Sequence, residues 1–275
     1  MQLGIFAKTF PGTTPDAVLA AARDAGYAAV QYNMACSGLP SLPVSIDRAI
    51  ARAVAAASKR SGVAIAALSA TYNMIHPDLS VREEGRASFA ALAAAAPIMG
   101  TRLLTVCTGS RDADDQWRHH PDNAGPAAWR DLIAEFEHLL PIAEAHDIAI
   151  GVEPELGNVV SSAVKARALL DHFASPRIRI VLDPANLFEV ASPTERDALV
   201  DEAVQLLGNA LAMAHAKDRH ADGSFATAGD GVIDFGHFIG ALRQAGFDGP
   251  LVTHGLAAGD AARVAAFLKA SGASA

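Results

Sequence analysis

The feature that most constrains the fold of this sequence is a repeated joint, where a helical apolar pattern ends and a short strand-like run begins. Five of these joints carry a glycine: Gly26, Gly62, Gly100, Gly208 and Gly246. Glycine suits the left-handed backbone position that often ends a helix. Two further joints use other breakers, His146-Asp147 and Ser175-Pro176. These seven joints each introduce a strand and Leu3 to Phe6 supplies one more at the start, so the sequence predicts eight strands.

The segments between the strands have the spacing of helices. From Trp129 to Ala143, for example, apolar residues recur at intervals of three and four, which places them on one helical face. The strands are continuous apolar runs, as expected for a parallel sheet that is covered on both faces. Eight such units in 275 residues predict an α/β fold, a single (β/α)8 TIM barrel over residues 1–275, since this class typically needs about 250 residues. A doubly wound open sheet is the alternative, but the GxGxxG and P-loop motifs are absent.

Charge and hydropathy disfavour two classes of partner. A net charge of −8 has the wrong sign for a sequence-independent grip on nucleic acid or on anionic lipid. No apolar run reaches the roughly 18 residues of a membrane-spanning helix, and the first residues do not have the pattern of a signal peptide. Cys36 and Cys107 form no CxxC motif, which favours a reduced protein. We therefore expect a cytoplasmic protein with neither nucleic acid nor a membrane as partner.

Four consecutive predicted strands end in residues of the kind that bind metal ions. These residues are Glu153, Asp183, His215 and His254. In a barrel the carboxyl ends of the strands surround one mouth, where enzymes of this class place their chemistry. One polar residue at a strand end is common, but four ligand-type residues on four neighbouring strands are harder to produce by chance. The set predicts a mixed oxygen and nitrogen site for one divalent metal ion.

At this point the chain resembles the xylose isomerase-like TIM barrels of the sugar phosphate isomerase/epimerase superfamily. The resemblance is carried by GVEPE, VLDPAN, AHAKD and the later segment GDGVIDFGHFIGALRQAGFDGPLV. That superfamily typically holds its metal with Glu, Asp, His and Glu after strands five to eight. Glu153, Asp183 and His215 match this pattern, whereas His254 stands where the family has its second Glu. The extra imidazole shifts the expected ion from Mg²⁺ towards Mn²⁺, Zn²⁺, Co²⁺ or Fe²⁺.

The resemblance implies a metal-dependent isomerase or epimerase that acts on a sugar or sugar phosphate, a small polyhydroxylated carbonyl compound. Its chemistry would be proton transfer through a metal-stabilised enediolate, with Glu153 as ligand and base. A metal-bound His254 has no free lone pair for proton exchange, so isomerisation by one base is favoured over epimerisation by two. Barrels of this group often form dimers or tetramers, so a homodimer or a homotetramer is a candidate assembly.

Three other functions stay open. Dehydration of a polyol-derived ketone shares the first proton abstraction with isomerisation. A catalytically silent sugar-binding barrel would account for the replaced glutamate. An endonuclease IV-like phosphodiesterase that cleaves damaged DNA is the least favoured, because strand four ends in TVCTGS without a histidine and the net charge opposes DNA binding.

Two residues are candidates for catalysis besides Glu153. Lys217 lies two residues after His215, so by strand alternation it faces the same way and is placed to neutralise an enediolate. His76 follows strand three and is a candidate acid or base, although a histidine before Pro77 also fits a plain turn.

The candidate substrate-binding residues are Asn73, Glu155, Asn186, Trp117 and Arg111. For Glu155 and Asn186 a capping or turn role is the open alternative. Trp117 and Arg111 belong to the loop TGSRDADDQWRHHPDN after strand four, which is long enough for a lid or binding loop. In it Trp117 would stack on a sugar face and Arg111 would meet a phosphate or carboxylate.

Overall fold

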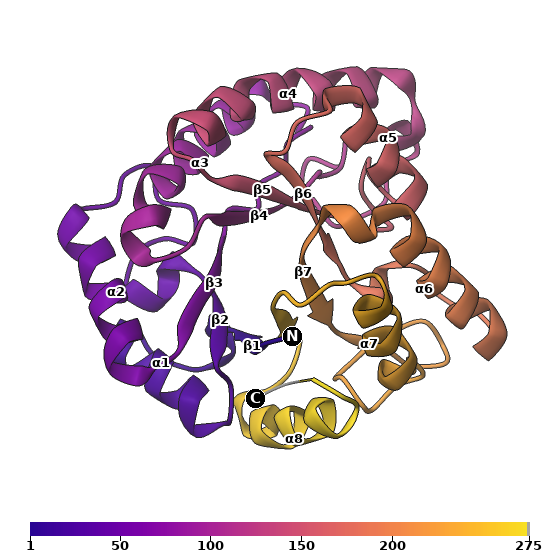
Figure 1. Ribbon diagram of the computed structural model, residues 1–275. Helices are drawn as coiled ribbons and strands as arrows, with labels where there is room; N and C mark the ends of the chain where they lie inside the picture. Colours follow the sequence, from indigo (N-terminus) through magenta and orange to yellow (C-terminus); the bar gives the residue numbers. More distant parts are fainter. Residues whose placement is uncertain (274–275) are drawn as a thin grey trace.

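The computed structural model describes residues 1–273 and shows a closed barrel of parallel strands inside a ring of helices (Figure 1). The predicted (β/α)8 TIM barrel is therefore confirmed. Eight strands form the barrel: β1 (Leu3–Phe6), β2 (Ala29–Tyr32), β3 (Ala64–Ser69), β4 (Leu103–Cys107), β5 (Ala149–Glu153), β6 (Ile178–Leu182), β7 (Leu211–Ala216) and β10 (Leu251–Thr253). Neighbours along the chain are neighbours in the sheet, and the pairing of β1 with β10 closes it.

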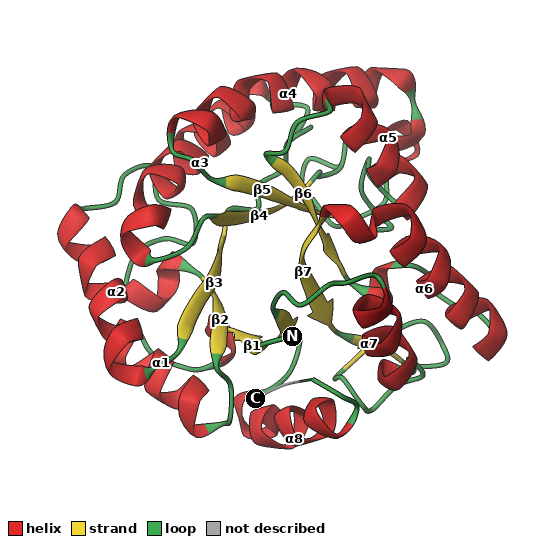
Figure 2. Cartoon of the chain, in the orientation of Figure 1, coloured by secondary structure: helices red, strands yellow, loops and turns green. Residues whose placement is uncertain are grey.

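One helix follows each barrel strand on the outside (Figure 2). These are α1 (Pro15–Asp24), α2 (Arg48–Ser61), α3 (Leu79–Met99), α4 (Pro126–Ala145), α5 (Ala163–Phe173), α6 (Pro193–Leu207), α7 (Phe235–Gln244) and α8 (Ala261–Ala270). Within residues 1–273 no helix is both long enough and apolar enough to cross a bilayer. Between β7 and α7 the sequence pattern missed a small antiparallel hairpin, β8 (Asp218–Arg219) with β9 (Phe225–Ala226).

The glycine joints adopt the predicted backbone with one exception. Gly26, Gly62, Gly100 and Gly246 all have φ between 74° and 96°. Gly208 instead has φ −48° and starts a 3-10 turn before β7, so its left-handed assignment is wrong. At the two joints without glycine, Asp147 (φ 52°) and Ala174 (φ 47°) take the left-handed position. Arg102 and Arg177 bind the carboxylate of Asp147 and hold it there.

The floor of the barrel shares three strands, β6, β7 and β10, with the predicted metal ligands. Ala67, Leu103, Val181, Met213 and Val252 form a separate apolar cluster from five strands. Three members of this cluster, Val181, Met213 and Val252, each precede a predicted ligand by two residues. Strand alternation therefore directs the apolar residue and the predicted ligand of each pair to the interior. The fourth ligand, Glu153, follows Gly151, where a Cβ would come within 3.0 Å of Val181 and 3.1 Å of Leu103. The predicted ligands thus form a polar layer next to a packed apolar layer.

Candidate metal centre

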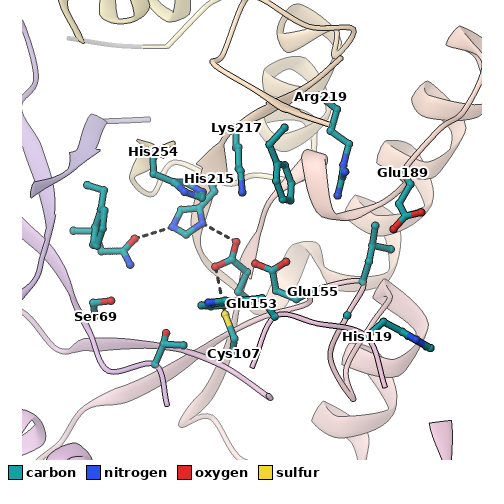
Figure 3. A pocket seen from close by; sticks show the side chains of 17 residues that line it. Ser69, Cys107, His119, Glu153, Glu155, Glu189, His215, Lys217, Arg219 and His254 are labelled. Carbon is teal, nitrogen blue, oxygen red and sulfur yellow. Dashed lines mark hydrogen bonds and ion pairs between the residues drawn. The ribbon is translucent and has the colours of Figure 1, made fainter. Parts of the chain in front are cut away.

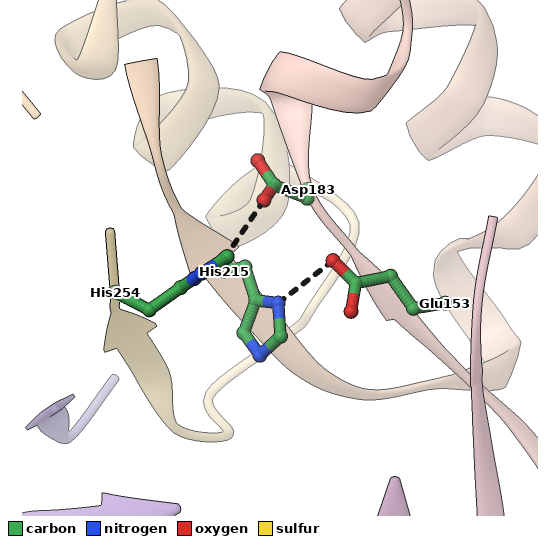
Figure 4. A group of neighbouring side chains, drawn as sticks. All are labelled: Glu153, Asp183, His215 and His254. Atoms are coloured by element: carbon green, nitrogen blue, oxygen red, sulfur yellow. Dashed lines mark hydrogen bonds and ion pairs between the residues drawn. The ribbon is translucent and has the colours of Figure 1, made fainter. Parts of the chain in front are cut away.

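The structure brings the four predicted ligands together at the carboxyl end of the barrel (Figure 4). One ligand atom from each of Glu153, Asp183, His215 and His254 lies within 4.8 Å of the other three. Two pairs are in direct contact: His215 Nδ1 is 2.9 Å from Glu153 Oε1, and His254 Nε2 is 3.2 Å from Asp183 Oδ2. The two imidazole rings lie with centroids 4.5 Å apart. Asp183 and His215 are 1% and 3% exposed, so these polar groups are almost fully removed from water.

A hydrogen-bond chain from β2 and β4 sets the tautomer of His215. The Thr105 hydroxyl donates to the carbonyl of Leu68, which can only accept, and receives a hydrogen bond from Gln31 Nε2 at 3.0 Å. This orientation leaves Gln31 Oε1, an acceptor, 2.8 Å from His215 Nε2. His215 therefore carries its proton on Nε2, and the lone pair of Nδ1 faces Glu153.

The electrostatic environment of the cluster favours a bound cation. Burial, together with the nearby charge of Asp183, raises the pKa of Glu153 to about 8. Burial lowers the pKa of His215 to about 4, so its imidazole is neutral. Burial also acts to raise the pKa of Asp183, but the hydrogen bond and charge of His254 outweigh it and hold that pKa below its usual value. Two carboxylates and two imidazoles are thus held in a desolvated space where a positive charge would stabilise the ionised acids.

The spacing fits a shared metal ion. With bonds of about 2.1 Å, neighbouring ligands on one ion lie about 3.0 to 3.4 Å apart, close to the two contacts measured. Further groups orient the carboxylates from outside, as at many metal sites. Ala185 N donates to Asp183 Oδ1 at 2.9 Å, and Asn186 Nδ2 to Glu153 Oε1 at 3.2 Å. The cluster is a candidate metal site with two oxygen and two nitrogen donors.

A cavity of about 960 Å³ opens above this cluster (Figure 3). Three of the residues predicted for substrate chemistry line it: Glu155, Lys217 and Trp117. Burial, followed by the charges of Glu153 and Asp183, raises the pKa of Glu155 to about 9. The ammonium of Lys217 lies 3.2 Å from the centre of the Phe225 ring. The amide of Asn186 touches Glu153 next to the cavity, and its buried Oδ1 has no hydrogen-bond partner in the described chain.

Three predicted residues lie away from the cavity lining. Asn73 uses its amide to bind backbone groups of Ser110 at 2.8 and 3.0 Å. Arg111 pairs with Asp131 at 2.8 Å, between α3 and α4. The ring nitrogens of His76 contact the backbone of Asp78 and, at 3.0 Å, the carbonyl of Ala113. This placement differs from the predicted catalytic and substrate-binding roles: the loops that carry these side chains turn them into structural contacts.

The loop after β4 is a fixed wall of the cavity. Asn123 Nδ2 donates to the carbonyl of Gly157 and Asn158 Nδ2 to that of Gln116, at 2.8 and 2.9 Å. A Cβ on Gly157 would lie 2.2 Å from the carbonyl oxygen of Trp117, so glycine permits this close approach. The loop is thereby fastened to the one after β5. The loop predicted as a lid or binding loop is thus hydrogen-bonded to its neighbour, with Trp117 and His119 at the cavity.

The sequence patterns missed several residues of the site. Gln31, Cys107, Arg219 and Phe225 all line the cavity. Gln31 was detectable as the one amide in the apolar strand Ala29–Tyr32, and Arg219 by extending the alternation from His215 and Lys217. Phe225 reaches the site through the β8–β9 hairpin, which no periodic pattern in the sequence predicts.

Known proteins share this architecture. The sequence model described as xylose isomerase-like TIM barrel matches residues 19–270. This chain belongs to the xylose isomerase-like TIM barrel family. No curated protein sequence is significantly similar to it.

Solved structures with a similar fold superpose over nearly the whole chain. A 3-keto-D-glucoside 4-epimerase from E. coli has a TM-score of 0.79 at 14% identity, covering 98% of this chain and 99% of its own. A D-allulose 3-epimerase from Methylomonas sp. has a TM-score of 0.74 at 19% identity, covering 98% of each chain. An L-ribulose 3-epimerase has a TM-score of 0.73 at 17% identity, covering 98% of this chain and 92% of its own. At these identities the likeness establishes the fold.

Proposed function

We propose that this member of the xylose isomerase-like TIM barrel family is a divalent-metal-dependent isomerase or epimerase of a sugar or sugar phosphate. The observation that carries the proposal is the cluster of Glu153, Asp183, His215 and His254 at the base of a large cavity. The sugar epimerases among the similar structures agree with it. Because two of the four donors are imidazoles, Mn²⁺, Zn²⁺, Co²⁺ or Fe²⁺ is favoured over Mg²⁺.

The reaction that suits these residues is proton transfer next to a carbonyl group. A bound divalent ion would polarise the carbonyl and a neighbouring hydroxyl of the substrate. Glu153 Oε1 faces His215, whereas its Oε2 lies 3.9 Å from Cys107 Sγ on the cavity wall. Oε2 is therefore the oxygen that can take the proton from carbon while Oε1 acts as ligand.

Return of the proton needs a group other than His254. The imidazole of His254, which replaces the usual glutamate and contacts Asp183 through Nε2, would be occupied in holding the metal ion. Glu155 and Lys217 both line the cavity and both carry protons that can be given up. Lys217 also contributes positive charge where an enediolate would develop negative charge.

Metal binding and hydrogen exchange test this proposal. Wild-type protein purified with metal present is expected to hold about one equivalent of ion, and the Asp183→Asn variant much less. A Lys59→Gln variant, altered on the outer helix α2, is the matched control and should bind metal like wild type. Near-zero metal in wild type and Asp183→Asn alike would refute the metal site. Metal-dependent uptake of deuterium from D2O by a ketose or ketose phosphate tests the proton transfer.

Dehydration of a polyol-derived ketone is the second candidate. It is favoured specifically because His254 stands in place of the second glutamate, so the cavity carboxylates near the metal centre lie on one side of it. Both cavity carboxylates near the metal centre, Glu153 and Glu155, come from β5 and the residues just after it. One base and one acid suffice for elimination of water, and Lys217 is a suitable acid for the departing hydroxyl. NMR analysis of products in D2O separates the two reactions, since dehydration releases water and forms a deoxy dicarbonyl compound, whereas isomerisation moves the carbonyl group without loss of water.

A further inference from the structure

Two cations share one wall of the cavity beside the proposed metal centre. Lys217 and Arg219 alternate along the extended segment after β7, so their side chains face the same way, and Figure 3 shows both pointing into the cavity. Lys217 Nζ lies 3.2 Å and Arg219 Cζ 4.2 Å from the centroid of the Phe225 ring. Attraction between the charges and the ring therefore helps to hold both cations in place.

Neither cation is neutralised by an acidic side chain in direct contact. Within residues 1–273, no Asp or Glu forms an ion pair with Lys217 or Arg219. Arg219 is 6% exposed and donates Nε to the carbonyl of Ala185 at 2.5 Å and Nη1 to that of Gly223. A guanidinium has five N–H donors, so the group retains donors after these contacts. The acids nearest to Arg219, led by Glu189, act on it without direct contact. Burial of a cation without a directly paired counter-charge is unfavourable, and a ligand can supply that pair.

The charges of the cavity indicate which ligand fits. A divalent ion would balance the two ligand carboxylates, Glu153 and Asp183. Two acidic groups of the lining remain, Glu155 and Glu189, and Glu189 is exposed to solvent. Glu155, whose raised pKa favours its protonated form, offsets at most one of the charges of Lys217 and Arg219. The sheltered part of the cavity therefore has an excess of positive charge, which an anionic group of the substrate would balance.

We propose that Lys217 and Arg219 form a subsite for a carboxylate, so that the substrate is a polyhydroxylated keto acid. The planar guanidinium fits a carboxylate through paired hydrogen bonds, and Lys217 adds a point charge. The cavity of about 960 Å³ is large enough to hold such a molecule with its carbonyl end at the metal centre. The inference rests on the proposed function for that carbonyl end.

Calorimetric binding to Mn²⁺-loaded protein tests the subsite with three kinds of probe. These are a neutral ketose (D-fructose), keto acids of the same length (D-fructuronate and D-tagaturonate) and a ketose phosphate (D-fructose 6-phosphate). We expect a keto acid to bind at least about tenfold more tightly than the ketose or the phosphate. Arg219→Gln should weaken keto acid binding about 10- to 100-fold, as for loss of a hydrogen bond to a charged group, and leave ketose binding unchanged.

Two further variants guard against effects of misfolding or of net charge. Arg219→Lys keeps the positive charge and should restore part of the affinity. Arg263→Gln removes a cation that pairs with Asp230 at the surface and should bind every probe like wild type. The inference is overturned by equal binding of ketose and keto acid, by tighter binding of the phosphate, by no binding of any keto acid, or by an equal loss in Arg263→Gln.

The outcome is separable from that of the proposed function. Keto acid binding that depends on Arg219 but brings no deuterium into the ligand would support the subsite and refute the proton transfer. Metal-dependent exchange into a neutral ketose, together with keto acid binding that Arg219→Gln does not weaken, would support the proton transfer and overturn the subsite.

Discussion

Replacement of Gln31 by leucine should weaken metal binding although Gln31 is not a ligand. Gln31 accepts a hydrogen bond from His215 Nε2 at 2.8 Å and is itself oriented by Thr105 at 3.0 Å. Leucine has a similar volume but no acceptor, so His215 would be free to carry its proton on Nδ1. That proton occupies the lone pair that faces Glu153, and it must move before a metal ion can bind.

The expected loss is about 10- to 100-fold in affinity, the usual effect of removing the hydrogen-bond partner of a metal-binding histidine. This corresponds to about 1.4 to 2.7 kcal/mol. Titration with Mn²⁺ in a calorimeter, or against a fluorescent chelator, measures it. Gln31→Glu is the matched variant, because its carboxylate still accepts from Nε2, and it should bind Mn²⁺ at least as tightly as wild type.

A direct readout accompanies the affinity. The nitrogen chemical shifts of His215 distinguish the two neutral tautomers, and the Nδ1-protonated form should appear in metal-free Gln31→Leu only. A metal affinity within twofold of wild type, in a variant with unchanged thermal stability, would refute the reasoning. Equal weakening in Gln31→Glu would also refute it, since the tautomer would then not be the cause.

Three further predictions concern the pH dependence of metal binding and the stability of the fold. Because the pKa of Glu153 is raised to about 8, Mn²⁺ must displace the proton of Glu153 when it binds at lower pH. The affinity for Mn²⁺ should therefore rise with pH from 6 to about 8 and then level off. A calorimetric affinity that does not change over this pH range would contradict the prediction. The buried Asp218 carboxylate accepts from four backbone N–H groups, those of Arg219, Gly229, Gly231 and Ile233; Asp218→Ala should therefore lower the free energy of unfolding by at least about 2 kcal/mol in urea titrations and speed hydrogen exchange of residues 219–233. A Cβ on Gly85 would lie 2.1 Å from the Tyr72 ring, so Gly85→Ala should lower the free energy of unfolding by about 1 to 3 kcal/mol. Gly240→Ala in α7, where a Cβ would have no atom within 4 Å, should leave that free energy unchanged or raise it by up to about 1 kcal/mol. Equal unfolding free energies of the two variants would show that Tyr72 tolerates the contact.

The helix-to-strand joints explain why the fold was predictable. Helices end at Gly26, Gly62, Gly100 and Gly246 through a local backbone preference of glycine. Such a preference depends on residues that are neighbours in the sequence, so the sequence predicts it. Gly208 shows the limit of this argument. Its joint was located correctly, but the chain continues there into a 3-10 turn without a left-handed residue, since several backbone conformations can link a helix to a strand.

The clustering of the four candidate metal ligands was predictable for a related reason. Glu153, Asp183, His215 and His254 end strands of one closed barrel, and parallel strands bring their carboxyl ends to one mouth. The loop residues Asn73, His76 and Arg111 lack this constraint. Their side chains are directed by partners elsewhere, as when Arg111 binds Asp131, so proximity to a strand end did not place them in the cavity.

The sequence alone thus predicted the (β/α)8 barrel and placed the four candidate ligands at neighbouring strand ends, because periodicity and strand alternation are local properties and the closed barrel brings those ends together. Only the tertiary structure decided which groups act on that site. Gln31 meets His215 across 184 residues of sequence, and Phe225 reaches Lys217 through a hairpin. Contacts of this kind depend on the three-dimensional closure of the barrel and on the paths of its loops, which no spacing along the chain specifies.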